Sequence, residues 1–216
     1  GVRVADNLVS ASLVLLVEGD TDVVGLSAIL GDRSDRLANS IKSGSLAVIS
    51  MRGVRNLASQ VALYRSLLCS IHVFVDYDKA AIGAADRAKQ ERLLEDSEIT
   101  YAVARGMSES EIEDLYASPV YASALREEFG INFPTRAFDS RRARRGIRMN
   151  DAFSASGQRP SQAGVKLKVA EAVAANPAVA VAGESASVLD ALVSNLESKL
   201  DSVERIGASP QLTAKR

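Results

Sequence analysis

Residues 13–22 read Leu-Val-Leu-Leu-Val-Glu-Gly-Asp-Thr-Asp, an uninterrupted apolar run that ends in an acidic turn. Such a run of leucine and valine is typical of a strand buried on both faces of a parallel sheet. Gly19 permits a sharp turn after the strand. Asp20 and Thr21 can then cap a helix, which we predict as far as Leu30. The stretch therefore predicts one β-α unit.

The alternation of apolar runs and helix-forming segments continues along the first half of the chain. Further strands are predicted at 46–51, 71–75 and 99–104, and helices at 54–68 and 84–95. Because the strands are almost entirely apolar, the sheet should be parallel and covered by helices on both faces. The sequence thus predicts an α/β fold with a parallel sheet flanked by helices.

The second half of the chain shows helical patterns and no evident strand. Helices are predicted at 111–116, 120–129, 161–175 and 184–200, with an arginine-rich loop after the second of them. We therefore predict an α/β domain at 1–116, a mainly helical subdomain at 117–205 and a tail at 206–216.

Composition excludes some classes of protein and leaves others open. The 216 residues are 47% hydrophobic, enough to bury a core, and 26 basic residues nearly balance 27 acidic ones, so net charge neither supports nor excludes DNA binding. Cys69 is the single cysteine, and there is no zinc-type cluster, signal peptide or long apolar run. A reduced, cytoplasmic setting without a membrane is expected.

Acidic residues follow two of the predicted strands. Glu18 and Asp22 come after the first strand, and Asp76 and Asp78 after the third. The carboxyl ends of parallel strands form the ligand-binding edge of an open α/β sheet. Carboxylates held together there repel one another unless protons or cations neutralise them, and Mg²⁺ prefers oxygen ligands. The pattern predicts a site for Mg²⁺ or Mn²⁺.

Each acidic group also has a simpler explanation. Glu18-Gly19-Asp20 alone is more often a strand-to-helix turn with capping acids, and a lone Asp-x-Asp after a strand is often only a solubilising loop. Their joint occurrence on β-α units of the right order favours function.

Two stretches together carry a family resemblance. Leu-Leu-Val-Glu-Gly-Asp-Thr-Asp at 15–22 and Val-Phe-Val-Asp-Tyr-Asp at 73–78 resemble the signature motifs of the TOPRIM fold. The later segment Met-Ser-Glu-Ser-Glu-Ile-Glu-Asp-Leu at 107–115 resembles the acidic segment of the overcoming lysogenization defect (OLD) nucleases. The resemblance implies a TOPRIM catalytic domain that cleaves DNA as an endonuclease with two metal ions. It also implies the C-terminal region of a larger protein with an N-terminal ATPase domain.

The resemblance implies roles for particular residues. Glu18, Asp22, Asp76 and Asp78 would be the main metal ligands, with Glu113 the preferred addition, Glu111 the next, and Ser108 or Ser110 as polar helpers. The two glutamates are two positions apart, so in a helix only one would point inward. A lysine from the second half would approach the scissile phosphate; Lys166 is the closest match, and Lys168 is its equal on chemistry alone.

Arginines are the candidates for contact with DNA. Arg52 and Arg55 follow the second predicted strand, and Arg141, Arg142, Arg144 and Arg145 form a cluster in the arginine-rich loop. Arginine binds phosphates without regard to sequence. The other interpretation of the cluster is a solvated loop.

Other functions remain open at this stage. A non-catalytic TOPRIM module that binds DNA or protein is the main rival to a nuclease, and a topoisomerase-like or primase-like TOPRIM enzyme is another. A tyrosine nucleophile or zinc-binding segment would support the last two, and the sequence offers no clear example of either. A homo-oligomer could form through the region absent from this chain.

Overall fold

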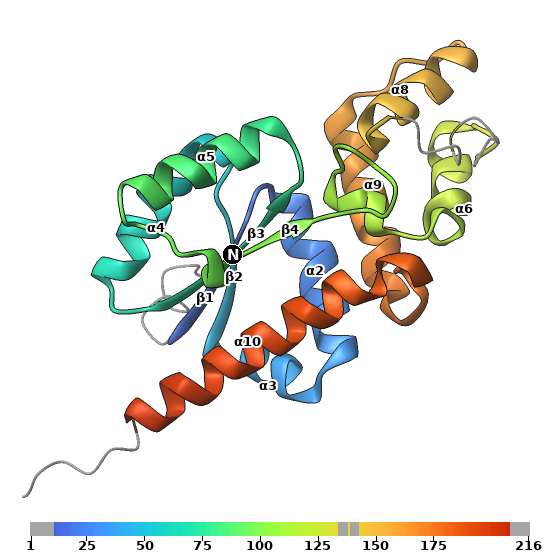
Figure 1. Cartoon of the computed structure of the whole chain (residues 1–216). Coiled ribbons are helices and arrows are strands. Elements are labelled where there is room, and N and C mark those ends of the chain that lie inside the picture. Colours follow the sequence, from blue (N-terminus) through green and yellow to red (C-terminus); the bar gives the residue numbers. More distant parts are fainter. Residues whose placement is uncertain (1–10, 134–137, 139–142, 208–216) are drawn as a thin grey trace, which may run out of the picture.

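The computed structural model describes residues 11–133, 138 and 143–207. Its centre is a four-stranded parallel sheet in the order β2-β1-β3-β4, shown in Figure 1. The strands are β1 (Leu13–Val17), β2 (Leu46–Ser50), β3 (Ser70–Asp76) and β4 (Ile99–Ala102). The predicted α/β class and parallel sheet are confirmed.

Helices cover both faces of this sheet. On one face lie α4 (Leu57–Ser66) and α5 (Lys79–Gln90), and on the other lie α2 (Asp20–Arg33), α3 (Asp35–Ser43) and α10 (Ala186–Gly207), as Figure 1 shows. Along β1, Leu13, Leu15 and Val17 belong to one core cluster, whereas Val14 and Leu16 belong to the other. Since successive side chains point to opposite faces, both faces must be apolar, and this explains the uninterrupted apolar run.

The remaining helices are connected to the α/β part through α9 (Gln162–Ala175), as Figure 1 shows. They are α6 (Ser118–Phe129), α8 (Arg145–Ala155) and α9 itself, with short 3-10 turns at Val54–Asn56, Asp96–Glu98, Ile112–Leu115, Pro177–Val179 and Gly183–Ser185. Helix α9 packs on both α2 and α6, and α10 contacts β1, β3 and β4. Both halves of the chain share one core cluster. The domain boundaries at 116 and 205 stay a prediction.

Several predicted elements need correction. The helix predicted at 84–95 runs from Lys79 to Gln90, because Asp78 accepts a hydrogen bond from Ala81 N and caps it. The segment predicted as a helix at 111–116 is a 3-10 turn. Helices α3 and α8 were not predicted at all: α3 lies in a polar stretch, and α8 begins in what was taken for a loop.

Gly25 of α2 has no room for a side chain, because Tyr116 and, from α9, Val173 pack against it. A Cβ at this position would lie 2.7 Å from the Tyr116 hydroxyl. We expect Gly25→Ala to lower the free energy of unfolding by about 1–3 kcal/mol. Gly31→Ala, on the same helix, is the control, because its new Cβ would meet Ala38 Cβ at an ordinary 3.7 Å. Denaturant unfolding measures both, and equal effects would contradict the close contact.

Candidate metal centre

The pairing of β1 with β3 brings the first acidic residues together. Val17 is aligned with Phe74, so Glu18 and Asp76 emerge at the same edge of the sheet. Asp22 lies in the first turn of α2, which starts at that edge. These three residues line a cleft of about 480 Å³, together with Arg52 and Lys166. The predicted meeting of the strand ends therefore occurs.

Asp22 is held in place by the turn that Gly19 allows. Its Oδ2 accepts a hydrogen bond of 2.7 Å from Gly19 N, and the side chain is buried. Burial, followed by the nearby Glu113 carboxylate, raises its pKa from 3.8 to about 7. An acid in this state favours a proton or a metal ion beside it.

Burial and neighbouring carboxylates also raise the pKa values of Asp76 and Glu18. Asp76 accepts a hydrogen bond of 2.8 Å from Ile112 N. Its pKa lies well above 3.8 because of burial, and then because of the charges of Glu113, Glu18 and Asp22. The pKa of Glu18 is raised by burial first and by Asp78 next. Glu18, Asp22 and Asp76 line the same cleft, and repulsion from neighbouring carboxylates adds to burial in raising their pKa values.

The acidic segment around 110 is attached to the end of β3. Tyr77 N donates to Ser110 O at 2.8 Å, and Ser110 N donates to Tyr77 O at 2.9 Å. The buried Ser110 hydroxyl donates to Ala102 O and accepts from Ala104 N. Ser110 therefore fastens the segment and is not the polar helper that was suggested for it.

Of the two candidate glutamates, Glu113 lies deeper. It is 3% exposed, and neither carboxylate oxygen makes a hydrogen bond with the residues that the structure describes, although Lys166 Nζ lies 3.1 Å from Oε1 as an ion pair. Glu111 instead accepts a hydrogen bond of 3.0 Å from Gly146 N at the start of α8. Buried, unsatisfied carboxylate oxygens are costly unless a cation binds them.

The two candidate lysines lie on different sides of α9. Lys166 lines the cleft and faces Glu113. Lys168 pairs with Glu128 and Glu171 at 3.4 and 3.2 Å. Only Lys166 is placed where it could meet a phosphate in the cleft.

Asp78 stands apart from the other predicted ligands. Its Oδ1 caps α5, and its Oδ2 accepts a hydrogen bond of 2.6 Å from Arg144 Nη1. It is not among the residues that line the cleft. Both oxygens of Asp78 therefore already accept a hydrogen bond from the described residues.

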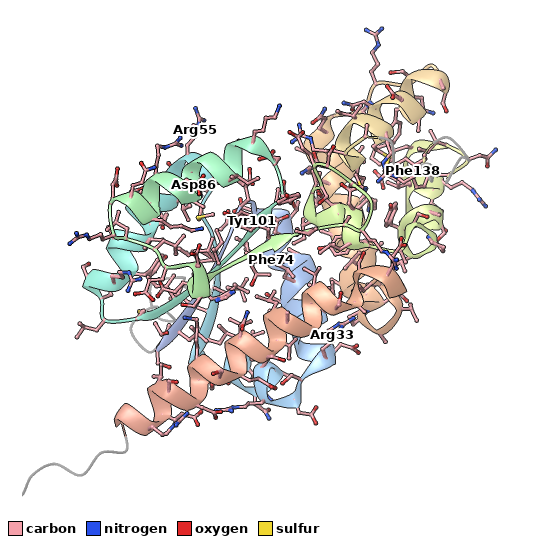
Figure 2. All side chains as sticks on the ribbon, in the orientation of Figure 1. Arg33, Arg55, Phe74, Asp86, Tyr101 and Phe138 are labelled. Atoms are coloured by element: carbon pink, nitrogen blue, oxygen red, sulfur yellow. The ribbon has the colours of Figure 1, made fainter. Side chains whose placement is uncertain are left out.

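The arginine candidates differ in their positions. Arg52 is exposed and lines the cleft, whereas Arg55 is exposed on the α4–α5 side of the sheet, as Figure 2 shows. Arg145 is 1% exposed, with its guanidinium 5.0 Å from the centroid of the Tyr121 ring, so the predicted contact of Arg145 with DNA does not fit this structure. Arg141 and Arg142 lie outside the described residues.

Asp114 and Arg148 organise this region, a role that the sequence did not predict for either of them. Asp114 is fully buried and accepts hydrogen bonds from Glu111 N and Arg145 N, at 2.8 and 3.1 Å. It also forms an ion pair with Arg148, which in turn bonds the backbone carbonyl of Phe138, labelled in Figure 2. A buried arginine pairs with an acid far away in sequence, and no local pattern reveals that.

The residues present fit a hard divalent cation. Within the described ranges, no three Asp, Glu, His or Cys side chains already converge as a coordination sphere. The acidic side chains that line the cleft nevertheless offer carboxylate oxygens, and the buried oxygens of Glu113 have no hydrogen bond among the described residues. Such an acidic, oxygen-rich group suits Mg²⁺ or Mn²⁺. Glu18, Asp22, Asp76 and Glu113 would hold it.

The raised pKa of Asp22 predicts how stability depends on pH without metal. The folded state binds this proton more tightly than the unfolded chain, so the stability it provides is complete below pH 3.8 and is lost as pH rises to about 7. We expect a loss of no more than about 4 kcal/mol over this range. Asp22→Asn should flatten the profile measured by denaturant unfolding; an unchanged slope would contradict the assignment.

Comparison with known proteins places the first part of the chain. A family model described as "Overcoming lysogenization defect protein-like, TOPRIM domain" matches residues 11–78. No curated protein and no solved structure matches. No helix of the described part is long and apolar enough to cross a membrane.

The matched residues hold both acidic motifs, Glu18 to Asp22 and Asp76 to Asp78. The match lies at the N-terminal end of this chain, and so it does not bear out the expected C-terminal position. TOPRIM domains typically bind divalent metals such as Mg²⁺ and are associated with nucleic-acid-processing enzymes. Residues 11–78 of this chain match the TOPRIM domain of OLD-like proteins.

Proposed function

We propose that this chain is a divalent-metal-dependent endonuclease that hydrolyses phosphodiester bonds in DNA. One observation carries the proposal: Glu18, Asp22 and Asp76 line a cleft at the carboxyl edge of the sheet together with Lys166, whose ammonium faces the buried Glu113. The OLD-like TOPRIM match supports the same class of chemistry.

The carboxylates supply the negative charge that concentrates cations at this edge. Two divalent ions bound there would activate a water molecule and stabilise the negative charge of the transition state. Ligation by Glu18, Asp22, Asp76 and Glu113 would also relieve the repulsion that raises the pKa of the first three. The same charges that destabilise the metal-free centre thus favour metal binding.

Lys166 contributes a positively charged side chain to this cleft. Burial disfavours its charged form, but the carboxylates of Glu113, Glu111 and Asp76 together outweigh burial and raise its pKa. The side chain therefore stays protonated at neutral pH. An ammonium in this place can bind a phosphate oxygen and steady the charge that develops there.

Arg52 extends the positive surface at the mouth of the cleft. Its backbone has a positive φ of 55°, directly before Gly53, and Gly53 N donates to Glu18 O at 2.8 Å. This link ties the loop after β2 to the acidic turn after β1. We place a phosphate next to the cleaved bond at Arg52, and a more distant part of the DNA at Arg55.

The proposal includes partners and a setting. DNA is the substrate, and a cytoplasmic location fits the lone, buried Cys69. An ATPase domain in the same full-length protein remains part of the proposal.

A plasmid assay tests the function. The purified chain should nick or linearise supercoiled DNA with Mg²⁺ or Mn²⁺ and should leave it intact with a chelator. Metal binding without cleavage would instead favour the non-catalytic TOPRIM module. A covalent adduct between protein and DNA would favour a topoisomerase-like enzyme; against it, Tyr64, Tyr116 and Tyr121 are buried, and the rings of Tyr77 and Tyr101 pack together.

A further inference from the structure

Arg144 lies directly before α8 and reaches into the group of acidic side chains. Its Nη1 donates to Asp78 Oδ2 at 2.6 Å, and its Nε lies 3.8 Å from Glu109 Oε2 and 4.0 Å from Glu111 Oε1. The Nε is buried and makes no hydrogen bond within the described part of the chain. One guanidinium thus lies within ion-pair distance of three carboxylates, which come from two separate segments of the chain.

This contact occupies the oxygen of Asp78 that does not cap α5. Oδ1 accepts from Ala81 N at 2.9 Å and caps α5, so Oδ2 is the atom that could bind a metal ion. A guanidinium on this oxygen competes with a divalent cation, because it occupies one of the two lone pairs and because the two positive charges repel each other.

The start of α8 does not depend on this side chain. Gly146 N donates to Glu111 Oε2 at 3.0 Å, and Arg145 N donates to Asp114 Oδ2 at 3.1 Å. Arg148 forms a buried ion pair with Asp114 one turn further along. These bonds hold the helix, so the Arg144 side chain can leave Asp78 without unfolding it.

We propose that Asp78 is a further ligand of the metal centre when Arg144 leaves it, and that Arg144 is a resident counter-cation that competes with the divalent metal for Asp78 and so lowers the metal affinity of the centre. The inference rests on the proposed metal centre. Linkage is reciprocal: a metal ion bound at Asp78 weakens the contact of Arg144 with Asp78 by the same free energy as Arg144 weakens metal binding. The binding of metal then releases a guanidinium beside the cleft.

Calorimetric titration of the purified chain with MnCl₂ at fixed ionic strength tests this. We expect Arg144→Gln to bind Mn²⁺ about tenfold more tightly than the unchanged chain. Arg144→Lys keeps the charge but loses the fork of the guanidinium, and should fall between the two. Arg33→Gln is the control for loss of charge: Arg33 pairs with Asp190 on α10 (Figure 2), far from the centre, and its replacement should change nothing.

A second measurement keeps the proposal testable if Arg144→Gln folds poorly. The rise in melting temperature on adding Mn²⁺ should be larger for Arg144→Lys than for the unchanged chain. Equal or weaker Mn²⁺ affinity in both variants would overturn the role of Arg144 while leaving the metal centre intact. Absence of Mn²⁺ binding in the unchanged chain would instead overturn the metal centre, and this inference with it.

Discussion

Asp76→Asn is expected to abolish metal-dependent cleavage of DNA, with a loss of more than about 100-fold. Asp76 ends β3 and is partly buried, and after burial the charges of Glu113 and Glu18 contribute most to its raised pKa. Asparagine keeps the acceptor for Ile112 N but loses the negative charge that a metal ion needs. Plasmid nicking with Mg²⁺ measures the loss, and calorimetry with Mn²⁺ should show weaker binding.

The same substitution should make the metal-free chain more stable, because it removes a buried charge that its neighbours repel. This opposite effect separates loss of a ligand from loss of the fold. Asp86→Asn is the matched control, since Asp86 is exposed on α5 (Figure 2). Full cleavage by the Asp76 variant would refute its place in the centre.

Lys166→Ala should reduce cleavage by about 100-fold or more while leaving metal binding in place. The ammonium 3.1 Å from Glu113 is the cation of α9 that lines the cleft. Its removal takes a positive charge away from the phosphate, but it also frees Glu113 for the metal. Mn²⁺ affinity should therefore stay equal or rise while the single-turnover rate falls.

Lys168→Ala provides the control for this prediction. Lys168 has the same chemistry and the same helix, but pairs with Glu128 and Glu171 instead. Its loss should leave the rate within about twofold, since exposed ion pairs contribute little. Equal losses in the two variants would mean that α9 contributes charge in general rather than one positioned ammonium.

The fold was predictable where burial acts on both sides of a strand. The run from Leu13 to Val17 has no polar position because both faces of β1 are covered, and such a run can hardly be anything else. Helix α3 was missed because its apolar face is only Leu37 and Ile41, within a polar sequence. Its caps, Ser34 and Gly44, are the local signal that could have revealed it.

The sequence predicts which acidic residues meet at this edge of the sheet, but it does not decide which basic residues lie beside them. Strand order alone brings Glu18 to Asp76, but the choice between Lys166 and Lys168 depends on which side of α9 faces the sheet. The local sequence does not determine which side of α9 faces the sheet. Arg145 was expected at the surface because it lies in an arginine-rich run, yet Tyr121, from a different helix, covers it.

Asp78 shows a different limit of the sequence. A carboxylate after a strand can be a metal ligand or a helix cap, and both functions need the same residue at the same place. The structure shows the capping bond to Ala81 and the contact with Arg144. Asp76 and Asp78 belong to one motif, yet Asp76 lines the cleft whereas Asp78 caps α5 and contacts Arg144.

The most direct test of the central claim is anomalous diffraction from crystals of the chain soaked in Mn²⁺. The account predicts Mn²⁺ bound by oxygens of Glu18, Asp22, Asp76 and Glu113, in the cleft that Lys166 lines. An anomalous signal elsewhere on the protein, with these carboxylates unbound, would contradict it.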